Sequence, residues 1–177
     1  MGIRNYLIDG VSGAGKSTVA RELERRGYHV IHGDRALAYY GDPRTGEPLG
    51  EPPVDPEADE LARWYGRWIW PVAKVKSLLA DHSHPMTFFC GGSRNSDRFV
   101  DLFDGVFLLE VDLDTLHRRL AGRTGDDFGG TSTERALVVR VHATRDGLAK
   151  HATPIDATRP VDRVVDEILA LCGANRS

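Results

Sequence analysis

Residues 10–17 read GVSGAGKS, and this stretch constrains the fold of the chain more than any other feature. It fits the pattern G-x-x-x-x-G-K-[ST], in which glycines let the backbone curl tightly around phosphate groups. An apolar run at residues 6–8 precedes it, as a buried strand would, and Val19, Ala20 and Leu23 follow it at helical spacing. The sequence therefore predicts a strand, a phosphate-binding loop and a helix, in that order.

This loop is expected to bind a nucleoside triphosphate. Lys16 would reach the β- and γ-phosphates, and the Ser17 hydroxyl would bind Mg²⁺. Backbone N–H groups and the positive end of the following helix would bind the remaining phosphate oxygens. The residues of the loop predicted to bind ATP are Gly10, Ser12, Gly13, Ala14, Gly15, Lys16, Ser17 and Thr18.

Composition limits the class of protein. The chain has 177 residues, of which 41% are hydrophobic and 28% charged, as in an ordinary soluble globule. A net charge of −3 argues against nucleic-acid and anionic-membrane partners. Cys90 and Cys172 are too few for a disulfide framework or a zinc site, and His82 and His84 have no third ligand nearby. We therefore expect a cytoplasmic protein without a signal peptide or membrane span.

Apolar strands alternate with helical patterns along the chain, which predicts an α/β fold with a parallel sheet. The second strand is expected at residues 28–32, so that Asp34 follows its carboxyl end, where open α/β sheets bind their ligands. Asp34 could also cap a helix expected over residues 35–40. The two roles are compatible.

A loop and an amphipathic segment come next. Residues 41–56 are too rich in glycine and proline for a regular element. Apolar residues over 61–79 then follow one face of a long helix, with a kink or two abutting helices at Pro71. We expect most of its aromatic side chains in the core, although Trp64 or Trp68 could stack on a planar substrate.

The third strand is expected at residues 86–90. Gly91 and Gly92 follow it and would permit close approach of a ligand, and Arg94 would stand at the same sheet edge as Asp34. A short helix that Ser96 or Asp97 would cap is expected to run through Phe103.

In the last third of the chain, the sequence pattern predicts a strand over 106–111 and a helix beginning after Asp112. A polar loop is expected over 124–130 and a helix over 133–151. Arg119 and Arg123 share one helix face, from which they could close over a phosphate or remain solvated charges. A strand over 153–156 and a helix ending near Cys172 complete the fold.

The sequence resembles the nucleoside monophosphate kinase branch of the P-loop kinases, which includes adenylate kinase and the similar shikimate and gluconate kinases. Residues 10–18, 88–94, 119–123 and 155–161 carry the resemblance. It implies one P-loop kinase domain over 1–177, with a five-stranded parallel sheet and helices on both faces. A lid over about 119–145 and an acceptor-binding insert over about 41–85 would complete the domain.

The resemblance also implies roles for single residues. Arg94 would hold the acceptor, Arg119 and Arg123 would belong to the lid, and Arg159 lies in the turn that packs on adenine. One departure is notable, because Cys90 stands where such kinases have an acid that supports magnesium. Asp34 is therefore expected to work with both the metal and the acceptor.

We expect an ATP- and Mg²⁺-dependent phosphotransferase, monomeric or homodimeric, that acts on the hydroxyl of a nucleoside or small metabolite. The expected catalytic residues are Lys16, Asp34, Arg94, Arg119 and Arg123. The expected substrate-binding residues are Asp34, Arg35, Trp64, Trp68, Gly91, Gly92 and Arg94.

Three alternatives remain open at this level. A nucleoside monophosphate kinase would surround an acceptor phosphate with cations, for which Arg35, Arg94, Arg63 and Arg67 are available. A nucleotide-dependent switch or ATPase is less well supported, because the chain lacks N/T-K-x-D and a strand that ends in Asp-Glu. An antibiotic-resistance factor would use the same residues as the expected kinase.

Overall fold

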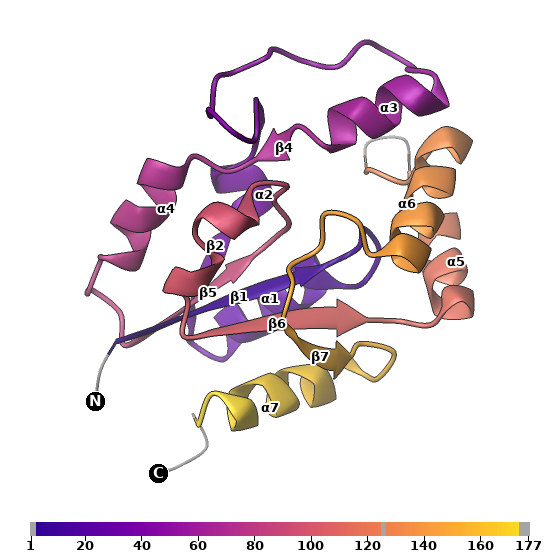
Figure 1. Ribbon diagram of the computed structural model, residues 1–177. Coiled ribbons are helices and arrows are strands. Elements are labelled where there is room, and N and C mark those ends of the chain that lie inside the picture. The colour runs from indigo at the N-terminus through magenta and orange to yellow at the C-terminus, as the bar shows by residue number, and fades with distance from the viewer. Residues whose placement is uncertain (1–2, 125–126, 174–177) are drawn as a thin grey trace.

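The computed structural model describes residues 3–124 and 127–173 and is built around one parallel sheet (Figure 1). The strands are β1 (Arg4–Gly10), β2 (His29–His32), β3 (Tyr39–Tyr40), β4 (Trp68–Ile69), β5 (Met86–Cys90), β6 (Gly105–Glu110) and β7 (Thr153–Asp156). The α-helices are α1 (Lys16–Arg25), α2 (Gly33–Ala36), α3 (Ala58–Tyr65), α4 (Val72–Leu79), α5 (Leu113–Ala121), α6 (Ser132–Thr144) and α7 (Val161–Leu171). Two short 3-10 helices, η1 (Ser96–Arg98) and η2 (Val100–Leu102), follow β5.

The main sheet has five strands in the order β2-β5-β1-β6-β7, and every pairing in it is parallel. This confirms the predicted five-stranded parallel sheet. The strand that carries the phosphate-loop motif lies at its centre, between β5 and β6. The loops that follow the strands therefore meet at one edge, where α/β proteins bind their ligands.

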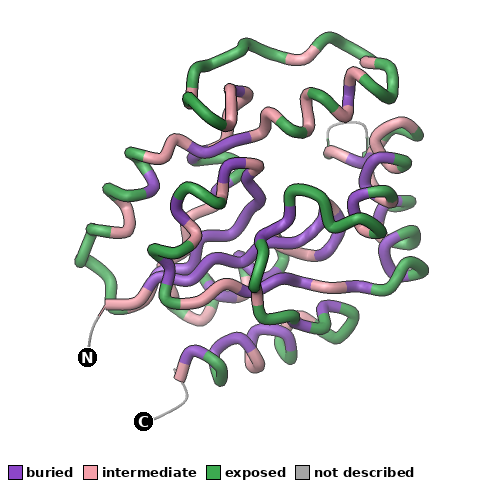
Figure 2. Tube along the Cα trace, in the orientation of Figure 1, coloured by how far each residue is buried: buried purple, intermediate pink, exposed green. Residues whose placement is uncertain are grey.

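Side chains of β1 alternate between two cores, because successive residues of a strand point to opposite faces. Ile8 packs into the core that α1 and α7 cover, together with Leu23 and Ile168. Leu7 packs into the second core, which contains the fully buried Trp70 beside α4. Figure 2 shows this burial along the central strands. Helices thus cover both faces of the sheet, as predicted.

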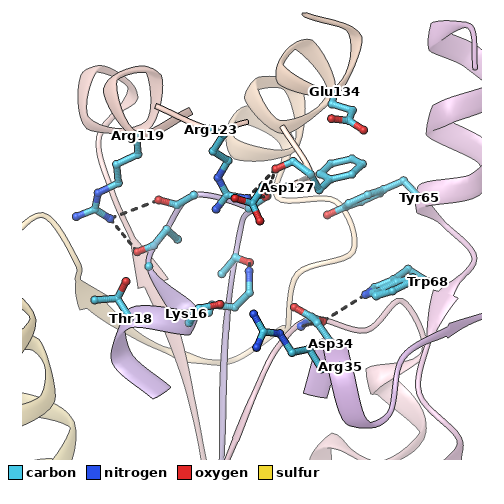
Figure 3. A pocket seen from close by; sticks show the side chains of 18 of the residues that line it. Lys16, Thr18, Asp34, Arg35, Tyr65, Trp68, Arg119, Arg123, Asp127 and Glu134 are labelled. Carbon is cyan, nitrogen blue, oxygen red and sulfur yellow. Dashed lines mark hydrogen bonds between the residues drawn. The ribbon is translucent and has the colours of Figure 1, made fainter. Parts of the chain in front are cut away.

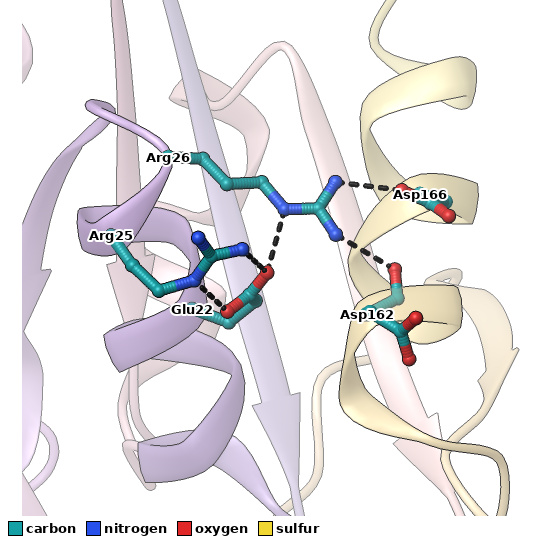
Figure 4. Close-up of polar contacts among 5 residues, drawn as sticks. All are labelled: Glu22, Arg25, Arg26, Asp162 and Asp166. Atoms are coloured by element: carbon teal, nitrogen blue, oxygen red, sulfur yellow. Dashed lines mark hydrogen bonds and ion pairs between the residues drawn. The ribbon is translucent and has the colours of Figure 1, made fainter.

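A polar network joins α1 to α7 on the first of these faces (Figure 4). Arg26 donates to the Asp166 carboxylate at 2.6 Å and to the Asp162 carbonyl at 3.0 Å. Glu22 accepts from both Arg25 and Arg26, and these hydrogen bonds lower its pKa to about 2. The network fixes the end of the helix that begins at the phosphate loop.

Three predicted helices are wrong in extent. The helix expected over 35–40 is only α2, whose N-cap is His32 rather than Asp34, and Tyr39–Tyr40 instead pair with Trp68–Ile69 as an antiparallel ladder. The predicted break at Pro71 is present, since Pro71 is the N-cap of α4, but the pairing places β4 between α3 and α4, so the two helices do not abut. Long-range pairing here overrides the local helical pattern.

The third helix, expected over 133–151, is α6 and ends at Thr144, because Arg145 adopts a left-handed conformation with φ 62°. The chain then turns and buries Leu148 and Ala149. The short helix expected after Arg94 is the pair of 3-10 turns η1 and η2. The loop over 41–56 holds only an isolated bridge between Gly41 and Pro48, in agreement with its predicted irregularity.

Several features are absent from the described residues. Cys90 and Cys172 are free and buried, so they form no disulfide there. Within residues 3–124 and 127–173 no group of three or more His, Cys, Asp or Glu side chains could hold a metal ion. In the same residues, no helix is both long and apolar enough to span a bilayer.

A histidine pair at the edge of the sheet makes stability depend on pH. The rings of His29 and His84 stack at 3.8 Å, and His29 Nδ1 lies 3.0 Å from Thr87 Oγ1. Burial, and then the like charge of His84, lower the pKa of His29 from 6.5. Because the unfolded chain binds this proton more readily, stability is greatest above about pH 6.5 and is lost as pH falls through the folded pKa.

We therefore expect the free energy of unfolding, measured by urea titration, to fall between pH 7.5 and pH 5. The decrease should be smaller in His29→Asn, which keeps a hydrogen-bonding group but cannot titrate. His117→Asn, at an exposed site on α5, is the matched control and should retain the wild-type slope. Equal slopes in the wild type and His29→Asn would contradict this expectation.

Candidate active site

A cleft of about 1080 Å³ opens at the carboxyl edge of the sheet (Figure 3). The phosphate loop, α2, α3, the end of β5, the lid segment (residues 119–145) and the turn after β7 all contribute to its lining. The predicted site residues that line it are Gly10, Ser12, Gly13, Ala14, Gly15, Lys16, Ser17, Thr18, Asp34, Arg35, Trp64, Trp68, Gly92, Arg94, Arg119, Arg123 and Arg159. Gly91 does not line the cleft.

The phosphate loop has the backbone geometry that its glycines predict. Gly13 and Gly15 have φ angles of 88° and 105°, a region that side chains with a Cβ rarely adopt. A Cβ at Gly13 would also lie 3.1 Å from Leu116 Cδ1. Lys16 Nζ donates to the carbonyl of Gly10 and, at 3.2 Å, to that of Val11. The ammonium is thus held at the mouth of the loop.

Charges around Lys16 compensate for its burial. Burial lowers the pKa of the ammonium, while Asp34 and then Asp9 act in the opposite direction. The nearby cations Arg94 and Arg123 favour loss of the proton. A phosphate group would relieve that repulsion, which makes this cluster of cations suited to an anion.

Asp34 lies on α2, directly after β2, and is exposed to the cleft. Its Oδ1 accepts from Trp68 Nε1 and from the Gly92 N–H, both at 3.3 Å. Gly91 lies beneath it, since a Cβ there would be 3.0 Å from Asp34 Oδ1 and 2.9 Å from Trp70 Cζ2. Gly91 therefore acts by allowing α2 to pack against β5.

Ser17 and Asp34 offer a hydroxyl and a carboxylate to a second cavity of about 40 Å³, which Lys16 and Cys90 also line. Oxygen ligands of this kind suit Mg²⁺. Burial raises the pKa of the Cys90 thiol far above its usual range, so this residue stays protonated and is a poor metal ligand. The residues present therefore fit magnesium, with Asp34 as the charged ligand.

Arg119 and Arg123 of the lid segment contact the phosphate loop and are not free surface charges. Arg119 donates to the Ala14 carbonyl at 3.0 Å and to the Ala157 carbonyl at 2.7 Å. Arg123 donates to Ser12 Oγ at 3.1 Å and to the Phe128 carbonyl at 2.7 Å. Both therefore lie on the same side of the sheet as Lys16. Residues 125–126 of the polar loop predicted between α5 and α6 lie outside the described residues.

The remaining predicted cations differ in their availability. Arg159 pairs with Glu167 and donates to the Asp156 carbonyl at 3.3 Å, so its position is fixed beside the turn after β7. Arg35 is exposed at the cleft. Arg67 instead stacks over the Trp64 ring at 5.0 Å, and neither Arg63 nor Arg67 lines the cleft.

An aromatic wall faces the phosphate loop across the cleft. Tyr40 contacts Trp64 and Trp68 edge to face, with centroids 5.4 and 4.9 Å apart, and these three rings are half-buried. Tyr65 stacks on Phe128 of the lid segment at 6.3 Å. Trp64 and Trp68 therefore line the cleft, as the alternative to a core position allowed, and are not fully buried in the core. We name Asp34, Tyr40, Trp64, Trp68 and Arg94 the acceptor compartment, after the role that we propose for these residues.

Arg94 is enclosed within this compartment. Its Nη1 donates to the Tyr65 hydroxyl at 2.7 Å, and its guanidinium carbon lies 4.3 Å from the centroid of the same ring. On its other side is the backbone of Gly147, where a Cβ would be 2.5 Å from Nη1. Its Nε is buried and has no hydrogen-bond partner among the residues that the structure describes. Packing thus fixes this guanidinium in one position.

Asp9, at the end of β1, is a charged residue of the site that the sequence did not reveal. It is 1% exposed, and its two oxygens accept from the Gly10 N–H at 2.7 Å and the Ala149 N–H at 2.8 Å. Burial raises the pKa of this carboxyl, while Lys16 and Arg94 oppose that change. The only local signal was a carboxylate between an apolar strand and the loop motif.

The fold and the site together define a P-loop nucleotide-binding protein, with a loop after the central parallel strand and arginines folded over it. A family model described as "AAA domain" matches residues 7–137. The chain therefore belongs to this AAA domain family. No curated protein matches the sequence.

Solved structures share the fold at low sequence identity. An unliganded sugar kinase from Janibacter sp. HTCC2649 is 17% identical, with a TM-score of 0.57 over 97% of this chain and 95% of that chain. A gluconokinase from Sinorhizobium meliloti 1021 is 22% identical, with a TM-score of 0.54 over 94% and 90%. A shikimate kinase from Acinetobacter baumannii in complex with shikimate is 15% identical, with a TM-score of 0.58 over 99% and 96%. The chain thus has the fold of P-loop small-molecule kinases, as the sequence resemblance implied.

Proposed function

We propose that this protein transfers the γ-phosphoryl group of Mg-ATP to a hydroxyl of a small molecule, such as a nucleoside or another metabolite. The observation that carries the proposal is the position of Asp34. Its carboxylate lines the same small cavity as Lys16 and Ser17, and it accepts a hydrogen bond from Trp68 of the aromatic wall. A hydroxyl held by Asp34 would therefore be presented to a phosphate held by Lys16.

Phosphoryl transfer needs alignment and charge neutralisation more than covalent chemistry from the protein. The phosphate loop and Lys16 would hold the β- and γ-phosphates, and Arg123 would shift from Ser12 to the phosphate oxygens. Asp34 would orient the acceptor hydroxyl and take its proton as the new O–P bond forms and the bond to ADP breaks. The lid segment would exclude water, which is the competing acceptor.

Magnesium, held by Ser17 and Asp34, would supply further charge neutralisation on the phosphates when bound. Arg119 and Arg159 would lie beside the adenine, next to the turn after β7. We propose residues 41–85 as the acceptor-binding insert, because the aromatic wall comes from Tyr40 and from this segment. The buried free thiols of Cys90 and Cys172 support a reducing compartment such as the cytoplasm.

Transfer to an acceptor phosphate is less well supported. Such an acceptor calls for several uncompensated cations in the acceptor compartment. Arg94 lies in the field of the buried Asp9 carboxylate, and Arg63 and Arg67 do not line the cleft. Only Arg35 is left among the cations considered for this role, which favours a hydroxyl.

The family description raises the possibility of an ATPase whose product is a conformational change. The strands on either side of β1 do not support it. β5 ends in the protonated thiol of Cys90, and Glu110 at the end of β6 pairs with Arg145. A nucleotide-dependent ATPase without a small-molecule substrate would also not need the acceptor compartment beside Asp34.

An ADP-release assay with labelled γ-phosphate tests the proposal. The panel comprises nucleosides, nucleoside monophosphates, sugars, hydroxy acids and aminoglycosides. We expect one class of alcohols to receive label in proportion to the ADP formed. ADP release that no acceptor stimulates, and that instead needs a protein partner, would contradict the proposal and favour the ATPase.

A further inference from the structure

Arg94 and Asp9 are opposite charges separated by the bare backbone of Gly92. A Cβ at Gly92 would lie 2.8 Å from Arg94 Nη2 and 3.0 Å from Asp9 Oδ1. The two charged atoms are therefore within about 6 Å of each other, a distance at which buried charges still interact strongly. They do not form a direct ion pair among the described residues.

Both partners of this charge pair are held in place. Asp9 is fixed by the two backbone N–H groups, which belong to the phosphate loop and to the segment after α6. Arg94 is fixed between the Tyr65 ring and Gly147. Neither side chain can turn away, so the two charges stay close together, and Asp9 interacts with Arg94 as well as with Lys16, its stronger charge partner.

The two backbone N–H groups alone do not explain the carboxylate of Asp9, whose charge partners are Lys16 and then Arg94. Two backbone N–H groups could be satisfied by a neutral side chain or by water, without the cost of burying a carboxylate. A buried carboxylate next to a cation that lines the ligand cleft instead changes the charge that a ligand meets.

We propose that Asp9 determines the charge specificity of the acceptor compartment. Its carboxylate offsets the charge of Arg94, so the compartment takes uncharged hydroxyl compounds and disfavours anionic ones. This inference rests on the proposed function, since it names the charge class of the acceptor at the same site. Removing the charge of Asp9 should turn Arg94 into an anion-binding residue.

The experiment measures anion binding in the absence of turnover. The protein is saturated with magnesium and a non-hydrolysable ATP analogue, so that the phosphate loop is occupied, and inorganic sulfate is titrated by calorimetry. We expect no saturable binding to the wild type below about 10 mM, and an affinity at least about tenfold higher in Asp9→Asn. The double variant Asp9→Asn/Arg94→Gln should return to the wild-type result.

Several outcomes would overturn the proposal. Unchanged sulfate affinity in Asp9→Asn would do so, as would a gain that persists in the double variant, because the anion would then bind elsewhere. If Asp9→Asn does not fold, sulfate binding is compared between the wild type and Arg94→Gln instead. The proposal requires both to bind sulfate equally weakly, whereas tight binding that Arg94→Gln abolishes would reject it. The sulfate titration needs no turnover, so it can be interpreted even if the protein phosphorylates no acceptor. The proposed function and the proposed role of Asp9 can therefore be rejected independently.

Discussion

Replacing Lys16 with alanine should lower acceptor-dependent ATP turnover by at least about a thousandfold, in line with the loss of a preorganised charge at a transferring group. The ammonium is held by the carbonyls of Gly10 and Val11, at the point where the glycine loop converges. Initial rates at saturating ATP, together with nucleotide binding by calorimetry, measure the effect.

Folding should survive this change. Burial lowers the pKa of Lys16, so its removal relieves a desolvated charge, which offsets the charge partner that Asp9 loses, and the protein should remain folded. Lys74→Ala, on the exposed face of α4 and away from the cleft, is the matched control and should keep the wild-type rate. A Lys16→Ala protein that is folded and turns over at a rate close to wild type would refute the assignment.

The second large effect is expected for Asp34→Asn, which should lower kcat by about a hundredfold to a thousandfold, as is usual for loss of a general base. Asparagine can still accept from Trp68 and Gly92, so the geometry should persist while the proton acceptor is lost. Binding of the ATP analogue without magnesium should change little.

Trp68→Phe provides the comparison for this variant. It removes the indole donor at 3.3 Å from Asp34 but keeps the carboxylate and an aromatic ring. Its kcat should stay within about tenfold of wild type, because a single hydrogen bond as long as 3.3 Å contributes modestly. If Asp34→Asn loses no more than Trp68→Phe does, Asp34 positions the site and does not accept the proton.

The parts of the fold that sequence predicted best are those with strong local patterns. β1, β5 and β6 are runs of apolar residues buried on both faces, and the loop after β1 has its glycines at the required spacing. Helical periodicity failed in the insert, because Tyr39–Tyr40 and Trp68–Ile69 pair across almost thirty residues. A pairing between strands this far apart cannot be predicted from the local sequence of either strand.

The site shows the same division between local and distant information. The cleft residues that follow strands, such as Asp34 and Arg94, could be placed from strand ends alone. Asp9 was missed because its meaning depends on Ala149, which is 140 residues further along the chain, and on Arg94. Trp64 and Trp70 look alike in sequence, yet one lines the cleft and the other is fully buried in the second core.

The insert and the lid segment touch each other, since α3 packs against α6 and Tyr65 stacks on Phe128. A ligand bound beside the insert and a ligand bound beside the lid segment therefore both affect the same α3–α6 contact. Thermodynamic linkage makes the effect reciprocal, so whatever factor nucleotide adds to acceptor affinity, the acceptor must add to nucleotide affinity. Kinetically, the two substrates should show synergistic rather than independent saturation.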